Sequence, residues 1–164
     1  MDVHYLTGVE AEVAERACNY AAEIAKNSKC KKSKNGAVII KGGAILGEGW
    51  NTPVPDVECD PCLREDIHDN GRVELCHAVH AEVNAILDAL GKHHDIRGAV
   101  MYHARIKNGV IKRTNTPSCT GCSRVVERVG LEGFVLIHEQ GYAFYPADEF
   151  NRLSYEYFGK TPPK

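Results

Sequence analysis

Hydrophobic residues along the chain follow two different spacings. Apolar side chains recur every three or four positions in three segments, with charged residues between them, so we predict amphipathic helices over residues 9–29, 77–90 and 119–129. Shorter runs rich in β-branched and aromatic residues predict strands at residues 37–40, 44–46, 98–102 and 133–137. A last helix is expected to begin near Pro146 and to continue through Tyr157.

The connections between these segments indicate the fold class. Gly42-Gly43 separates the first two predicted strands and is typical of an antiparallel hairpin. The helix over 119–129 connects the last two, and such a crossover makes those strands parallel. We therefore expect an α/β protein with a three-layer α/β/α arrangement and a mixed sheet of about five strands. Residues 1–164 are expected to form a single domain.

Composition narrows the functional classes. A formal net charge of -2 gives no general attraction to nucleic acid or to a membrane, and no apolar run is long enough to span a bilayer. No secretory signal is visible in the first thirty residues. Seven cysteines without an export signal indicate a reducing compartment, where thiols bind metals instead of pairing. We expect a cytoplasmic protein that acts without nucleic acid or membrane partners.

Two short motifs carry the chemistry. The first is His77-Ala-Val-His80-Ala-Glu82, and the second, further along the chain, is Pro117-Ser-Cys119-Thr-Gly-Cys122. One imidazole and two thiols leave one position open on a tetrahedral zinc ion, which is typical of a catalytic site. Glu82 follows His80 too closely to share the same ion comfortably, so it is better placed to contact a water on the metal. The alternative is a purely structural zinc or no metal.

These motifs resemble the H-x-E…P-C-x-x-C signature of the zinc-dependent cytidine and deoxycytidylate deaminase superfamily. The resemblance implies that His80, Cys119 and Cys122 hold a catalytic zinc and that Glu82 is the general acid and base. It also implies a substrate site. In the family the backbone around the residue corresponding to Ala81 holds the pyrimidine, and an asparagine after a glycine and an aromatic residue contacts the sugar. Asn51 follows Gly49-Trp50 and inherits that role, unless its side chain only satisfies its own loop.

A second group of cysteines lies mainly in an irregular insert at about residues 53–76. Cys59 and Cys62 form a C-x-x-C, Cys76 precedes the first motif, and Cys30 follows the first predicted helix. The insert resembles that of microbial deoxycytidylate (dCMP) deaminases, some of which carry a second, structural zinc. These four thiols are the possible ligands, and His68 or His77 could replace one of them. Reduced cysteines without metal are the alternative.

An extra hairpin at about residues 104–113 departs from the family pattern. Asn108-Gly109 is the turn signal, and the segment is basic, with Arg105, Lys107, Lys112 and Arg113. Three interpretations are open: a solvated sheet edge, a phosphate clamp, or a contact with a polynucleotide. Ser118 also separates Pro117 from the first thiol, which leaves the C-x-x-C spacing intact.

The function we expect is hydrolytic deamination of a cytosine nucleotide, most simply dCMP, with release of ammonia. Other substrates remain open: a nucleoside, a free base, or cytosine in single-stranded nucleic acid. A zinc-binding interaction module, in which Glu82 has no catalytic role, is the alternative from another class. A homo-oligomer is expected.

Overall fold

The computed structural model describes residues 3–54, 58–113 and 116–163. Within these residues the helices are α1 (Gly8–Ala25), α2 (Ala81–Gly91), α3 (Thr120–Arg128) and α4 (Ala147–Glu156), with a short 3-10 turn at Val73–Leu75. The main sheet contains β1 (His4–Tyr5), β2 (Lys34–Lys41), β3 (Ala44–Trp50), β6 (Val100–Lys107), β7 (Val110–Lys112), β8 (Gly133–His138) and β9 (Gly141–Pro146). A separate small ladder pairs β4 (Thr52–Pro53) with β5 (Ala78–Val79).

The strands of the main sheet follow the order β1-β9-β8-β6-β2-β3, with β7 added to β6. β6 and β8 are parallel, and the other pairs are antiparallel, so the sheet is mixed as expected. Gly42 and Gly43 both adopt positive φ in the β2–β3 turn, which is the backbone conformation that this hairpin requires. The four predicted strands are confirmed as β2, β3, β6 and β8, and β7 pairs with β6 in the predicted extra hairpin. β9 was not predicted and gives the sheet its fifth long strand, and β1 extends it further.

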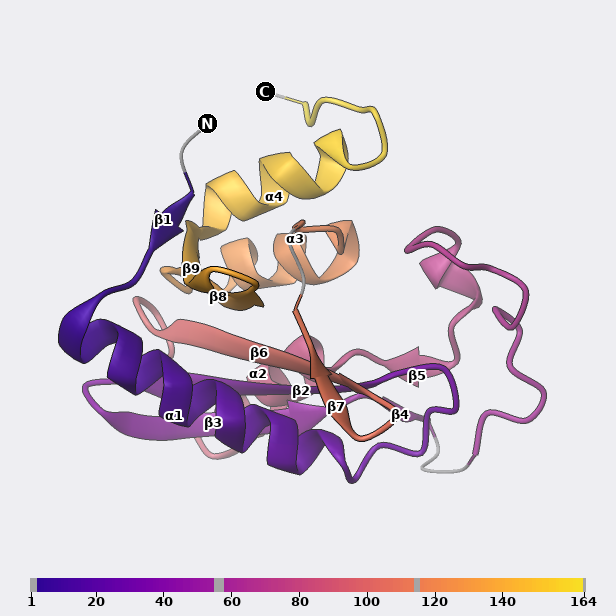
Figure 1. The fold of residues 1–164 in the computed structure, drawn as a ribbon, viewed down its shortest axis with the longest axis horizontal. Coiled ribbons are helices and arrows are strands. Elements are labelled where there is room, and N and C mark those ends of the chain that lie inside the picture. Colours follow the sequence, from indigo (N-terminus) through magenta and orange to yellow (C-terminus); the bar gives the residue numbers. More distant parts are fainter. Residues whose placement is uncertain (1–2, 55–57, 114–115, 164) are drawn as a thin grey trace.

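Side chains alternate between the two faces of the sheet and build a core on each side. Ile39, Met101 and Phe134 face α2, α3 and α4, whereas Val38 and Val135 face α1. Figure 1 shows α1 running along one face of the sheet, with α3 and α4 beyond the end formed by β8 and β9. The three-layer α/β/α arrangement is confirmed.

Several element boundaries differ from the predicted ones. α1 ends at Ala25 instead of residue 29, and Val9, predicted to lie in its buried stripe, is 73% exposed. α2 begins at Ala81 rather than at residue 77, because Ala78 and Val79 pair with β4 and are extended. β6 continues five residues past the predicted strand end.

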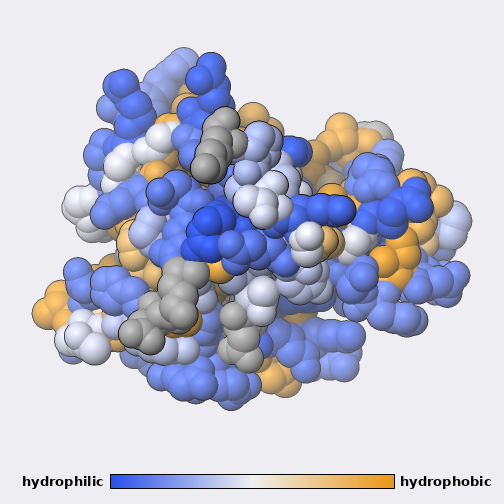
Figure 2. Space-filling view, turned by 90° about the horizontal axis from the view of Figure 1, so that it is seen from above, coloured by the Kyte–Doolittle hydropathy of each residue, from blue (hydrophilic) through white to orange (hydrophobic). Residues whose placement is uncertain are grey.

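The insert extends away from the main sheet at the right of Figure 1. Its predicted range, about 53–76, includes residues 55–57, which lie outside the described residues. Seen from above in Figure 2, the molecule is largely hydrophilic, and hydrophobic surface is conspicuous at the right, over the insert. In the described part of the chain, no helix has the length and apolar character needed to cross a bilayer.

Candidate active site

The start of α2 positions the first motif. His80 is the extended residue immediately before the helix, and its carbonyl accepts the hydrogen bond from the Asn84 amide at 3.0 Å. The Asn84 side chain donates to the carbonyls of Trp50 at 2.8 Å and Val79 at 3.2 Å. These bonds tie the first turn of α2 to the end of β3. The His80 imidazole makes no capping hydrogen bond to the helix and is therefore available to bind a metal.

The start of α3 positions the two thiols of the second motif. Cys119 precedes the helix, and its Sγ accepts a hydrogen bond from the backbone amide of Cys122 at 3.2 Å. An amide at a helix start stabilises negative charge on sulfur. Cys122 itself lies in the first turn and is 2% exposed. The start of α3 therefore favours the thiolate form of Cys119.

The starts of α2 and α3, two helices on the same face of the sheet, thus meet at one point. Nδ1 of His80 lies 3.2 Å from Sγ of Cys122 and 3.5 Å from Sγ of Cys119. All three donor atoms lie within 4.8 Å of one another. Ligand atoms on a tetrahedral zinc are separated by roughly 3.5–3.8 Å, from Zn–N and Zn–S bond lengths of about 2.0 and 2.3 Å. The three residues therefore fit one zinc ion with a fourth position left for another ligand.

The protonation of these ligands has a consequence for metal binding. Hydrogen bonds with Cys119 and Cys76 raise the pKa of His80 to about 11. The hydrogen bonds that Cys119 accepts from Cys122 and His80 lower the pKa of Cys119 to about 5. The hydrogen bond that the Cys122 thiol donates to Cys119, together with burial, raises the pKa of Cys122. Zinc must therefore displace protons from His80 and Cys122 on binding.

Glu82 lies beside the three ligands in the first turn of α2. Its Oε2 is 3.6 Å from Sγ of Cys122, and its Oε1 is 3.6 Å from Nε2 of His103 on β6. Burial alone would raise the pKa of Glu82, but the imidazoles of His103 and His80 outweigh it and the pKa is lowered. Burial lowers the pKa of His103. Glu82 is thus an ionised carboxylate next to the metal ligands and not one of them.

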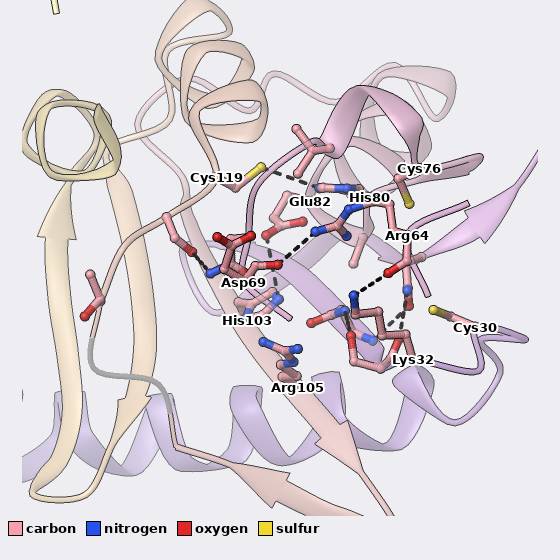
Figure 3. Close-up of a pocket in the computed structure, with 18 of the residues that line it drawn as sticks. Cys30, Lys32, Arg64, Asp69, Cys76, His80, Glu82, His103, Arg105 and Cys119 are labelled. Atoms are coloured by element: carbon pink, nitrogen blue, oxygen red, sulfur yellow. Dashed lines mark hydrogen bonds and ion pairs between the residues drawn. The ribbon is translucent and has the colours of Figure 1, made fainter. Parts of the chain in front are cut away.

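A cavity of about 290 Å³ opens above this cluster (Figure 3). Asn51 and Ala81 both line it, as expected from the family resemblance. The amide of Asn51 is used within the protein, however: Oδ1 accepts from the Asn35 backbone at 2.8 Å, and Nδ2 donates to the Ser33 carbonyl at 3.0 Å. These bonds shape the segment that enters β2. A substrate contact by Asn51 stays a prediction.

The insert forms one wall of the same cavity. Nδ2 of Asn70 donates to Oγ of Ser118 at 2.8 Å, which links the insert to the loop that carries Cys119. Arg64 supports this wall by donating to the backbone carbonyls of Asp69 and Gly71. The insert therefore contributes to the cavity that contains the metal ligands.

The second cysteine group also gathers at this wall. Cys30, Cys62 and Cys76 line the cavity. Burial, and then the other three thiols of the group, raise the pKa of Cys59. Among the described residues, however, only His80, Cys119 and Cys122 have their donor atoms within 4.8 Å of one another. The four cysteines of the second group do not form such a cluster. Their role as ligands of a second zinc stays a prediction.

Sequence reasoning missed His103 on β6 as a residue of the cavity, and it named Arg105 only as one cation of the basic hairpin. The signal was available, because both follow the buried Met101 at the two-residue spacing of a strand and so face the same side. Of the hairpin cations singled out above, Lys112 and Arg113 are not among the lining residues. Nη1 of Arg113 donates to the His138 carbonyl at 2.8 Å instead.

Comparison with known proteins identifies this arrangement. Residues 11–138 match the family model described as "Cytidine and deoxycytidylate deaminase zinc-binding region". The chain belongs to this deaminase family. Zinc is accordingly the metal of this deaminase, and the fitted donor set at His80 agrees with it.

Individual relatives of the deaminase are moderately similar in sequence. It is 31% identical over 123 residues to the deoxycytidylate deaminase of Mycobacterium phage D29, covering 70% of this chain and 86% of the relative. It is 30% identical over 120 residues to the deoxycytidylate deaminase of Schizosaccharomyces pombe, of which it covers only 34%.

Solved structures resemble the deaminase as well. The dCMP deaminase of cyanophage S-TIM5, in complex with dCMP and dUMP, matches with a TM-score of 0.56 and 26% identity, over 77% of this chain and 82% of that one. The cytidine deaminase of Burkholderia pseudomallei matches with a TM-score of 0.53 and 16% identity, over 83% and 94%, which bears on the fold alone.

Proposed function

We propose that this protein is a zinc-dependent deoxycytidylate deaminase, which converts dCMP and water to dUMP and ammonia. The observation that carries the proposal is the placement of Glu82 beside the three zinc-fitting donors at the floor of a cavity. The similarity to a dCMP deaminase solved with dCMP and dUMP supports the choice of substrate. The two deoxycytidylate deaminases similar in sequence support it further.

We assign the metal to His80, Cys119 and Cys122, whose donor set and spacing suit a catalytic zinc. Zinc held by one imidazole and two thiolates supplies Lewis acidity, which lowers the pKa of a bound water to about 7. The amide of Cys122 and the start of α3 hold negative charge on Cys119. The Cys122 amide and the start of α3 thus stabilise a metal ligand, and proton transfer is assigned to a different residue.

Glu82 is the group that moves protons in this proposal. Its carboxylate takes a proton from the attacking water and delivers it to N3 of the cytosine ring. The oxygen that has bonded to C4 then gives its remaining proton to the carboxylate, which passes it to the amino group. The C4–N bond breaks, ammonia leaves, and the C4–O bond becomes a carbonyl. His103, close to Oε1 of Glu82, orients the carboxylate for both transfers. The small exposure of both side chains, 13%, limits competing contact with solvent.

Ammonia release from a substrate panel tests the proposal. The purified zinc-loaded protein would be incubated with cytosine, cytidine, deoxycytidine, dCMP, dCTP and a cytosine-containing oligonucleotide. We expect the highest kcat/KM with dCMP. A preference for another compound would correct the substrate, and zinc binding without ammonia release from any of them would favour an interaction module.

Four further assignments belong to the same proposal. We propose that Cys30, Cys59, Cys62 and Cys76 hold a second, structural zinc, supported by the electrostatic effect of the other three thiols on Cys59. We also propose that residues 1–164 are one domain and that the protein is a cytoplasmic homo-oligomer. All seven cysteines are free, as a reducing compartment requires. Leu87 and Leu90, exposed on α2, are the apolar side chains that we assign to the contact between subunits.

A further inference from the structure

Arg105 is a cation of the cavity that the catalytic cluster does not use. It lies on the face of β6 that carries His103 and Met101, and its side chain lines the cavity (Figure 3). Its Nε is buried and has no hydrogen-bond partner in the described part of the chain. Leaving a buried donor of a charged group without a partner is unfavourable. A bound ligand that accepts a hydrogen bond from Nε of Arg105 would remove this cost.

The acidic side chains of the cavity are engaged elsewhere. Glu82 contacts His103, and Oδ1 of Asp69 accepts a hydrogen bond from the amide of Gly71 at 2.8 Å. Among the described residues, no carboxylate lies within ion-pair distance of Arg105. The protein thus supplies no counter-ion for this guanidinium, which leaves its charge available to an anion from outside.

The other two cations of the cavity, by contrast, are used to build its wall. Nζ of Lys32 donates to the carbonyls of Arg64, at 2.7 Å, and Ile67. The guanidinium of Arg64 donates to the carbonyls of Asp69 and Gly71. Unlike Lys32 and Arg64, Arg105 can offer its N–H donors to a ligand in the cavity.

The neighbours of Arg105 across the sheet reinforce this assignment. Asn35 on β2 and Lys112 on β7 are its register partners on the two sides, so the three side chains share one face. Two cations directly opposite each other, Arg105 and Lys112, repel, and an anion bound near them would relieve that repulsion. The extra hairpin therefore places two cations, Arg105 and Lys112, side by side next to Asn35 of β2.

We propose that Arg105 binds the 5′-phosphate of the nucleotide, with Lys112 adding positive charge at the rim. This rests on the proposed function and names the residue that selects a phosphorylated substrate. Arg105 lies about 7 Å further along β6 than His103, which contacts Glu82. That separation suits a molecule whose reacting ring and phosphate lie on opposite sides of a sugar. A guanidinium offers two parallel donors to phosphate oxygens, and its planar geometry favours this bidentate contact.

The test is the ratio of kcat/KM for dCMP to kcat/KM for deoxycytidine. Arg105→Gln should lower this ratio about 10- to 100-fold, because hydrogen bonds to charged groups are lost for only one of the two substrates. Lys112→Gln should lower it by a smaller factor. Lys107→Gln, which removes an exposed charge of the same hairpin, is the matched control and should leave the ratio unchanged. Equal losses with both substrates in Arg105→Gln would overturn the proposal.

Inorganic phosphate provides a readout that does not depend on turnover. Phosphate should raise the thermal midpoint of the zinc-loaded wild type and of Lys107→Gln, but not that of Arg105→Gln. Equal phosphate protection of the wild type and Arg105→Gln would overturn the assignment even if the protein deaminates dCMP. If the wild type released no ammonia from dCMP, the proposed function would fail, and the phosphate measurement would still decide the role of Arg105. If Arg105→Gln does not fold, Lys112→Gln carries both tests, and a ratio equal to the wild type's would count against the subsite.

Discussion

At the scale of the residue, Glu82 separates an enzyme from a metal-binding module. Glu82→Gln keeps the size of the side chain but cannot accept a proton. We expect kcat to fall about 10⁴-fold, the upper end of general acid–base contributions, because the same carboxyl acts at more than one transfer. Zinc content and thermal stability should stay near wild type, since Glu82 is not placed among the ligands. Steady-state ammonia release and metal analysis on the same sample measure both.

A matched control for this variant is Glu127→Gln, which changes an exposed carboxylate on α3 in the same way. It should have wild-type kcat. Loss of zinc from Glu82→Gln would make Glu82 a ligand. Retention of zinc together with more than about a tenth of the activity would mean that another group moves the proton.

At the scale of the element, the packing of α2 against β3 sets the position of His80 and Glu82. A Cβ added at Gly49 would lie 2.4 Å from the Ala85 amide and 2.7 Å from the Ala81 carbonyl. Gly49→Ala must therefore push the first turns of α2 away from the strand. We expect a loss of about 1–3 kcal/mol in the free energy of unfolding, measured by chemical denaturation, together with weaker zinc binding.

Gly91→Ala is the control for this packing argument, because Gly91 lies in the same helix and a Cβ there would meet no atom within 4 Å. Its stability should be unchanged or slightly higher, since alanine favours helix. If Gly49→Ala were as stable as Gly91→Ala, close packing of α2 on β3 would not be what positions the site.

The far end of the same helix is joined to β3 by a titratable bond. Oδ2 of Asp88 accepts from the Glu48 backbone amide at 3.0 Å and from Nζ of Lys92 at 2.8 Å. Partial burial alone would raise the pKa of Asp88, but these hydrogen bonds outweigh it and the pKa is lowered. A lowered folded-state pKa means that the stabilisation is present above the unfolded pKa, and that it disappears as the pH falls through the folded value.

Asp88→Asn should therefore reduce the free energy of unfolding by about 1 kcal/mol at pH 7. The difference from wild type should shrink as the pH is lowered below about 4, where both states of the wild type become protonated. Urea denaturation of the two proteins at several pH values measures it. A difference that does not change with pH would mean that the charge on Asp88 is not what stabilises the junction.

At the scale of the whole molecule, the insert, the segment that follows α1 and the loop that carries Cys119 meet around one cavity. If the second cysteine group holds zinc, fully loaded protein should contain two zinc ions per chain. Cys59→Ser should contain one, with a lower thermal midpoint and with activity lost only as the protein unfolds, because structural zinc stabilises the segment it closes. Elemental analysis and calorimetry measure these quantities.

Cys18→Ala is the control for cysteine loss. Cys18 lies on the buried face of α1, where burial raises the pKa of its thiol to about 12, and its substitution should leave the zinc count unchanged. A single zinc per chain in the fully loaded wild type would reject the second site.

The sequence by itself determined the layers of the fold and the three donor residues that fit zinc. Strand and helix spacing depend on local periodicity, so the sheet, the β2–β3 hairpin and the parallel crossover were predictable. The ligands were predictable because two helix starts bearing these side chains form a recognisable metal set. The hairpin turn at Asn108-Gly109 was predictable for the same local reason.

Only the tertiary structure decided how distant segments complete the site. α2 begins at Ala81 because residues 78–79 pair with β4, a contact that no local pattern encodes. The bond between Asn70 and Ser118 joins residues 48 positions apart and turns the insert into a cavity wall. Of the basic hairpin residues, Arg105 enters the cavity because β6 continues past its predicted end. Each of these outcomes depends on pairing and side-chain direction between remote segments, which sequence spacing alone does not specify.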